Sequence, residues 1–247
     1  MKYTRSILSF VSLVGLVTGC AAIFQPKTVS PVPFRVFGNA DNPTHICILL
    51  PGIRDRIDTF EKHDFTEIAA PLLSRNPNTA LITVDAHWGY YRERIIVERL
   101  GSDILERYPE ARITLVGASL GGFGALLTTL DFSERVERLV LLAPLLGEDD
   151  YQYLNRIRDR GFTDMPDDEE LTLALNRVWK FLLDDNRQVP ILIGYGADDS
   201  FTPYYRHLIS QNPPLVDIRE IPGGHDWTTW KRLWTGYAEI ALRYGAD

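Results

Sequence analysis

A glycine-rich stretch in the middle of the chain, residues 117–122, most limits how this sequence can fold. It follows an apolar run at residues 112–116 and precedes a run of small and apolar residues at 123–130. This pattern predicts a strand, a sharp turn with Ser119 at its apex, and a helix. Glycines suit such a turn because side chains at the flanking positions would collide with the strand or the helix. The alternative is an ordinary strand-to-helix turn with a small polar N-cap.

Strands alternate with helices along the rest of the chain. Short apolar runs predict the strands, and the segments between them predict helices. This order favours one α/β domain over residues 34–247, with a mostly parallel central sheet and helices on both faces. The predicted strands are 34–37, 45–50, 80–84, 112–116, 136–142, 190–194 and 216–221, and the predicted helices are 59–74, 92–108, 123–130, 149–160, 168–184, 202–211 and 227–244.

One segment, about residues 145–189, is too long for a plain crossover between two strands. Its two predicted helices are joined by an acidic turn at residues 163–170. Ligands of parallel sheets bind beyond the carboxyl ends of the strands. We interpret the segment as a small helical cap over that end of the sheet. Two ordinary helices of the covering layer are the alternative.

The N-terminus has the pattern of an export signal. Basic residues precede an apolar run at residues 7–17, and this run is shorter than a typical membrane-spanning helix. The run ends in Val-Thr-Gly-Cys and resembles a bacterial lipoprotein signal, which implies a signal peptide at 1–19, a lipidated Cys20 and a tether over 20–33. The periplasmic face of the cell envelope is then expected, and Ala21 in place of an aspartate favours the outer membrane. A plain secretory signal followed by a chance cysteine is the alternative.

Net charge and cysteine content limit the partners further. The net charge of −7 argues against a nucleic-acid-binding surface, which requires a basic face. The two cysteines imply no disulfide framework, and Cys47 lies inside an apolar run where a buried thiol is expected. The oligomeric state does not follow from these features.

Polar residues that suit acyl transfer follow three of the predicted strands. Ser119 follows one strand, Asp198 and Asp199 follow another, and His225 follows the last. A serine hydroxyl becomes a good nucleophile only when a base takes its proton, and histidine can do so near neutral pH. An aspartate fixes the orientation of the imidazole. Either aspartate suits this role, and the other then belongs to a solvated turn or caps a helix.

These motifs resemble those of the α/β-hydrolase superfamily over about residues 34–244. Residues 117–121 read G-A-S-L-G and resemble the nucleophile elbow of that fold, G-x-S-x-G. Residues 196–203 resemble its acid loop, G-x-x-D-x-x-x-P, which points to Asp199. Residues 223–230 resemble the histidine loop of the esterase D-like branch. The resemblance implies that the catalytic residues are Ser119, Asp199 and His225.

Two backbone N–H groups are expected to bind an oxyanion. That of Leu120 lies at the start of the helix that follows the serine. The resemblance implies that the second belongs to Ile53, in the loop after an earlier strand, with Pro51 where many members of the superfamily have histidine. Gly52 lets the backbone approach closely. The alternative for this loop is a tight turn without a catalytic role.

An aromatic loop follows the predicted strand 80–84. Residues 85–92 read D-A-H-W-G-Y-Y-R and resemble a stretch found in a group of uncharacterised bacterial α/β-hydrolases. We expect four of these side chains to line a pocket wall beside the serine, and plain packing is the alternative. They are His87, Trp88, Tyr90 and Tyr91.

Our first hypothesis is a lipid-anchored serine hydrolase that cleaves a carboxylic ester or thioester. It needs no metal or cofactor, and its expected partners are a small acyl ester or thioester and, through Cys20, the membrane. An acyltransferase with the same triad and a non-catalytic envelope binding protein on a hydrolase scaffold are the alternatives.

Overall fold

The computed structural model describes residues 27–39, 41–148, 151–160 and 170–243. The signal peptide prediction and Cys20 lie outside these residues. The centre of the molecule is a seven-stranded sheet in the order β1-β3-β2-β4-β5-β6-β7, in which only β1 runs antiparallel to its neighbour. Its strands are β1 Phe34–Gly38, β2 His45–Leu50, β3 Thr79–Val84, β4 Arg112–Ala118, β5 Val136–Leu142, β6 Ile191–Gly196 and β7 Val216–Ile221.

The burial of the strands explains their composition. Every residue of β2 and β3 is buried, and so is every residue of β4 after Arg112. Strands covered on both faces need continuous apolar runs, since neither face meets water. At the edge of the sheet β7 alternates between half-buried and exposed side chains over most of its length.

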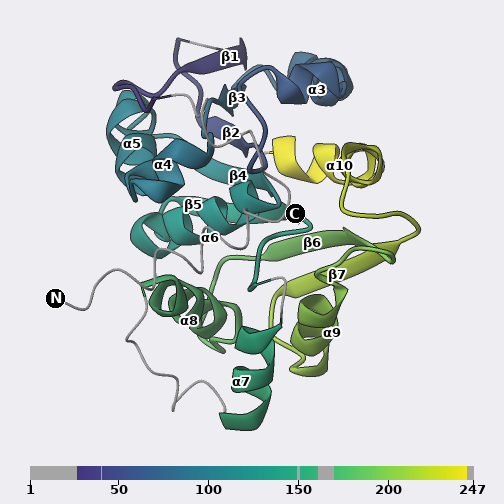
Figure 1. Ribbon diagram of the computed structural model, residues 1–247. Helices are drawn as coiled ribbons and strands as arrows, with labels where there is room; N and C mark the ends of the chain where they lie inside the picture. The colour runs from purple at the N-terminus through teal and green to yellow at the C-terminus, as the bar shows by residue number, and fades with distance from the viewer. Residues whose placement is uncertain (1–26, 40, 149–150, 161–169, 244–247) are drawn as a thin grey trace, which may run out of the picture.

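Helices cover both faces of the sheet (Figure 1). The pair α3 and α10 packs together on one face, and α5, α6 and α8 pack on the other. The predicted α/β architecture is confirmed. The helices are α2 Thr59–Lys62, α3 Phe65–Arg75, α4 Trp88–Arg92, α5 Ile96–Asp103, α6 Leu120–Phe132, α7 Gln152–Arg160, α8 Glu170–Leu182, α9 Thr202–Ser210 and α10 Trp227–Leu242.

Two helices predicted as continuous are broken. The predicted helix 59–74 consists of α2 and α3, because Asp64 between them takes a left-handed conformation with φ 63°. The predicted helix 92–108 is replaced by the end of α4, by α5 and by a short 3-10 helix, and Arg94 in the first break has φ 61°. A residue with positive φ cannot continue a right-handed helix.

The first described residues, 27–33, form a strap that packs on the domain. Val29 exchanges two backbone hydrogen bonds with the hydroxyl of Tyr90, at 3.1 and 3.0 Å. Val32 is 1% exposed, and its N–H donates to the Asp103 carboxylate at 2.8 Å. The predicted tether over 20–33 therefore includes seven residues that lie on the domain.

The segment predicted as a cap has two parts in the structure. Helix α8 packs against α6 and so lies in the layer that covers the sheet, with the indole of Trp179 donating to the Leu146 carbonyl at 2.8 Å. Helix α7 lies farther from the sheet (Figure 1). Just before α7, the Tyr151 hydroxyl donates to the carbonyl of Ser200, beside the predicted acid loop. Over the described ranges, no helix combines the length and apolar character that crossing a membrane requires.

Candidate active site

Ser119 lies at the sharp turn between β4 and α6. Its backbone has φ 53° and ψ −116°, a sparsely populated conformation for a residue with a side chain. The flanking glycines are required: a Cβ on Gly117 would lie 2.3 Å from the Gly121 carbonyl oxygen, and one on Gly121 would lie 2.0 Å from that of Leu50. The Ser119 N–H donates to the Leu142 carbonyl of β5 at 2.9 Å. The strained turn is thus held by the neighbouring strands.

His225 lies in the loop between β7 and α10 and reaches the serine. Its Nε2 is 2.8 Å from Ser119 Oγ, and its Nδ1 is 2.7 Å from Asp199 Oδ2. The rings of Phe201 and Trp230 flank the imidazole, with centroids 5.3 and 5.0 Å away. The imidazole therefore contacts both other groups and is restrained by aromatic neighbours.

The carboxylate of Asp199 is fully buried after β6, whereas Asp198 is exposed. Its Oδ2 contacts His225, and its Oδ1 accepts the Phe201 backbone N–H at 2.8 Å. A carboxylate held by both oxygens fixes the orientation of the imidazole that it contacts. Of the two adjacent aspartates, the structure brings Asp199 to the histidine.

The two predicted oxyanion donors lie on either side of the serine turn. Leu120 is the first residue of α6, where backbone N–H groups lack intrahelical acceptors and the helix dipole favours negative charge. The loop that carries Ile53 passes close by, since a Cβ on Gly52 would lie 3.8 Å from Ser119 Cβ. Neither N–H has an acceptor among the described residues. Both remain available to a negatively charged oxygen at the serine.

Comparison with known proteins agrees with this architecture. A protein-family model described as the alpha/beta hydrolase fold matches residues 74–177, the part that contains the serine turn. The chain has the α/β-hydrolase fold. No functionally curated protein matches the sequence.

Solved structures resemble most of the chain at low sequence identity. An S-formylglutathione hydrolase from Staphylococcus aureus matches at 15% identity and a TM-score of 0.60, over 86% of this chain and 90% of that chain. A ferulic acid esterase matches at 17% identity and a TM-score of 0.61, over 85% and 90%. A thioesterase domain from the curacin biosynthetic pathway matches at 13% identity and a TM-score of 0.54, over 86% and 95%.

An ion pair that sequence reasoning missed holds the loop after β2, residues 51–57, which carries Ile53. Arg56 donates to Asp85 through Nε at 2.8 Å and through Nη2 at 2.7 Å, and the Ile57 N–H donates to the same carboxylate at 3.0 Å. Burial opposes ionisation of Asp85, but its bonds to Arg56 lower its pKa overall. The only signal in the sequence was the position of Asp85 directly after β3.

The aromatic loop after β3 is largely engaged in packing. The ring Nδ1 of His87 accepts the Gly89 N–H at 3.0 Å and caps α4, and burial lowers its pKa. The Tyr90 hydroxyl forms hydrogen bonds with the backbone of Val29 in the strap. The ring of Tyr91 packs on Gly124 of α6, where an added Cβ would lie 2.4 Å from its hydroxyl. These contacts join α4 to the strap and to α6.

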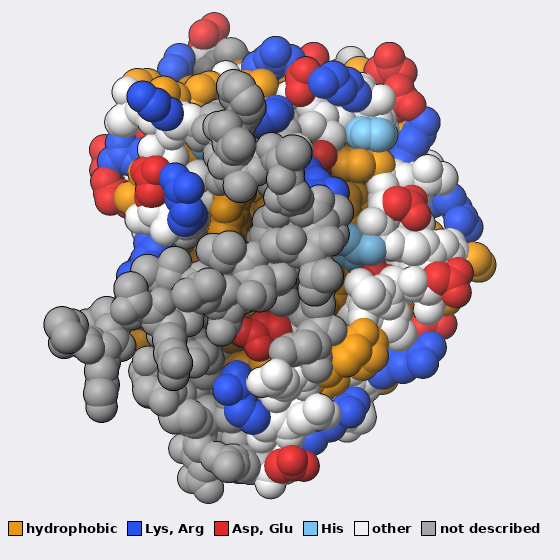
Figure 2. Space-filling model, viewed as in Figure 1, with side chains coloured by type: hydrophobic (Ala, Val, Ile, Leu, Met, Phe, Trp, Pro, Cys, Tyr) orange, Lys and Arg blue, Asp and Glu red, His pale blue; other side chains and the backbone are white. Residues whose placement is uncertain are grey.

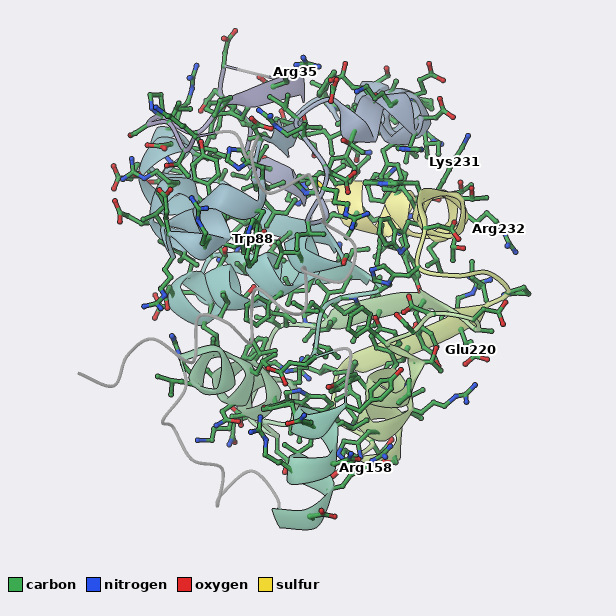
Figure 3. All side chains as sticks on the ribbon, viewed as in Figure 1. Arg35, Trp88, Arg158, Glu220, Lys231 and Arg232 are labelled. Carbon is green, nitrogen blue, oxygen red and sulfur yellow. The ribbon has the colours of Figure 1, made fainter. Side chains whose placement is uncertain are left out.

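Trp88 differs from these neighbours because it is half-buried. Figure 3 shows it near the centre of the view, whereas the labelled Arg35, Lys231 and Arg232 lie toward the rim. Figure 2 shows basic and acidic side chains interspersed over the described part of this face. No field of a single sign extends over that described surface.

Proposed function

We propose that this α/β-hydrolase is a serine hydrolase that cleaves a carboxylic ester or thioester through an acyl-serine intermediate. The observation that carries the proposal is the continuous chain of contacts from Ser119 Oγ through His225 to the buried Asp199 carboxylate. The esterase and thioesterase names of the similar structures agree with this reaction class.

The geometry supports the following steps. Ser119 Oγ attacks the acyl carbon while its proton passes to Nε2 of His225, and Asp199 stabilises the resulting imidazolium. The electron pair of the carbonyl moves to its oxygen, which the N–H groups of Leu120 and Ile53 bind. The tetrahedral centre then collapses, the bond to the alcohol or thiol breaks, and His225 returns the proton to the leaving group. Water repeats the sequence on the acyl-serine and releases a carboxylic acid.

A fluorophosphonate probe tests the nucleophile directly. We expect covalent labelling of the protein at Ser119, abolished in Ser119→Ala and retained in Ser210→Ala, which removes an exposed hydroxyl on α9. Labelling that survives Ser119→Ala would overturn the assignment. With p-nitrophenyl esters of increasing acyl length, Ser119→Ala should lose turnover at every length. Transfer to an added alcohol that outcompetes hydrolysis would indicate an acyltransferase instead.

We also propose that Cys20 carries the lipid and anchors the enzyme in the bacterial envelope. The support is the sequence alone: basic residues, a short apolar run and a small residue before the cysteine. Growth with an alkyne fatty acid should label the full chain and the Cys47→Ser variant equally, but not Cys20→Ser. Equal labelling of Cys20→Ser would exclude this anchor.

A further inference from the structure

We infer that Asp55 is a positioning residue that joins the oxyanion loop, residues 51–57, to the loop that carries His225. The inference rests on the proposed serine hydrolase function and adds to it what holds the second oxyanion donor in place. Asp55 itself contacts neither the nucleophile nor the base in the structure.

The side chain and backbone of Asp55 bind at two places. Its N–H donates to the Gly52 carbonyl at 3.1 Å and closes a tight turn that contains Ile53. Its Oδ1 accepts the indole N–H of Trp227 at 3.2 Å. Trp227 is two residues after His225 in the chain. A single aspartate thus links the turn of the oxyanion donor to the start of α10.

Trp227 is a firm attachment point because aromatic rings surround it. The ring of His63 stacks on it at 4.7 Å with an interplanar angle of 6°. Phe60, Phe65 and Trp230 meet it edge-on, with centroids 5.3, 5.5 and 5.0 Å away. Such pairs restrict the rotation of the indole. The indole N–H that donates to Asp55 is therefore held in a fixed position.

The Asp55 carboxylate lies close to the nucleophile. A Cβ on Gly52 would lie 2.7 Å from Asp55 Oδ2 and 3.8 Å from Ser119 Cβ, so the glycine leaves room for the carboxylate to fold over the turn. Among the described residues no lysine or arginine forms an ion pair with Asp55, and burial raises its pKa. A half-buried carboxylate that no lysine or arginine neutralises adds little to the stability of the fold. Its contacts favour a positional role.

The second half of the oxyanion loop is then held by two other elements. Asp85 binds it at Arg56 and Ile57, and Trp227 binds it at Asp55. Preorganised donors stabilise the transition state because they need not move when charge develops. Release of the Asp55 contact should therefore lower kcat and leave the binding of the ground-state ester, and so KM, nearly unchanged.

Kinetics of four variants and one control test the link on a p-nitrophenyl ester. We expect Asp55→Ala and Trp227→Phe each to lower kcat on the order of tenfold, with KM within about twofold. The double variant should be no worse than either single one, because both remove the same contact. Asp55→Asn keeps an acceptor oxygen and should restore most of kcat. Asp58→Ala, which removes a carboxylate that pairs with the exposed Lys62, is the matched control.

The affinity for a boronic acid, which forms a tetrahedral adduct with the serine, should fall in parallel with kcat. A wild-type kcat in Asp55→Ala, additive losses in the double variant, or no restoration in Asp55→Asn would overturn the inference while the proposed function stands. Failure of Ser119 labelling in the wild-type protein would overturn the proposed function instead. Thermal melting identifies a variant that fails to fold, and the variants that do fold then decide.

Discussion

The carboxylate of Asp199 meets the imidazole of His225 at 2.7 Å through Oδ2, while its other oxygen is held by the Phe201 backbone N–H. This double attachment leaves the carboxylate a single orientation in a fully buried position. The imidazole that it contacts must present its second nitrogen to Ser119. The pairing therefore selects the tautomer in which Nε2 is free to accept the serine proton.

Substitution of the two adjacent aspartates should separate their roles. Asp199→Asn removes the acceptor for the Nδ1 proton of His225, and kcat is expected to fall by about 10³–10⁴-fold, as in triads where the same change imposes the wrong tautomer. Asp198→Asn alters an exposed side chain and should leave kcat within about twofold. Steady-state hydrolysis of one ester by both variants is the measurement. Equal losses would contradict the assignment.

The ion pair of Arg56 and Asp85 should contribute to stability as well as to the site. Asp85 is 4% exposed and accepts three hydrogen bonds, so Asp85→Asn should lower the free energy of unfolding by about 1–3 kcal/mol. Arg56→Lys should also lower the free energy of unfolding, since a lysine cannot form two parallel bonds to Asp85. Urea denaturation measures both. As a control, Arg177→Lys changes a surface pair and should cost less than about 0.5 kcal/mol.

His45 should make the fold sensitive to acid. It is fully buried between Thr79 and Thr114, and burial, with a smaller contribution from Arg138, lowers its pKa from 6.5 to about 4. Above pH 6.5 its contribution to stability is present in full. As the pH falls from 6.5 toward 4, the unfolded chain binds a proton that the folded chain does not, and the free energy of unfolding should fall by about 2–3 kcal/mol.

Urea denaturation of the wild type and of His45→Gln at several pH values isolates this contribution. The glutamine does not titrate, so the difference between the two proteins should shrink as the pH falls. A difference that is independent of pH would rule out His45 as the source.

Two glycine substitutions in helices should have opposite effects. An alanine at Gly121 would place its Cβ 2.0 Å from the backbone oxygen of Leu50, and Gly121→Ala should lower stability by more than about 3 kcal/mol or abolish folding. An alanine at Gly236 on α10 meets only the Arg219 guanidinium at 3.6 Å. Gly236→Ala should raise stability by about 0.5–1 kcal/mol, because alanine favours the helix. Thermal melting compares the two variants.

The strands were predictable because a buried strand has few acceptable compositions. The predicted bounds 45–50 and 136–142 coincide with β2 and β5, and the predicted bounds 216–221 of the less buried edge strand coincide with β7. The helix breaks at Asp64 and Arg94 were not predictable: aspartate takes the left-handed conformation more often than most residues but still in a small minority of cases, and arginine gives no such signal.

The site was predictable only in its local parts. Strand-turn-helix spacing nominated Ser119, and the loop after the last strand nominated His225. The residues alone left Asp198 and Asp199 open, and only the resemblance of residues 196–203 to an acid loop pointed to Asp199, the carboxylate that is buried in the folded chain. Links between loops, such as Arg56 to Asp85, join residues far apart in sequence and leave no local pattern.

The strap at residues 27–33 would limit the reach of a lipid-anchored enzyme. Val29 and Val32 are bound to the domain, so the strap fixes the chain from about Lys27 onward. If Cys20 carries the lipid, as proposed, only seven peptide steps separate the membrane from the domain, at most ~25 Å when fully extended. That is less than the thickness of a bilayer's hydrocarbon core. The enzyme would then hydrolyse only esters that lie in, or arrive at, a thin layer above the membrane surface.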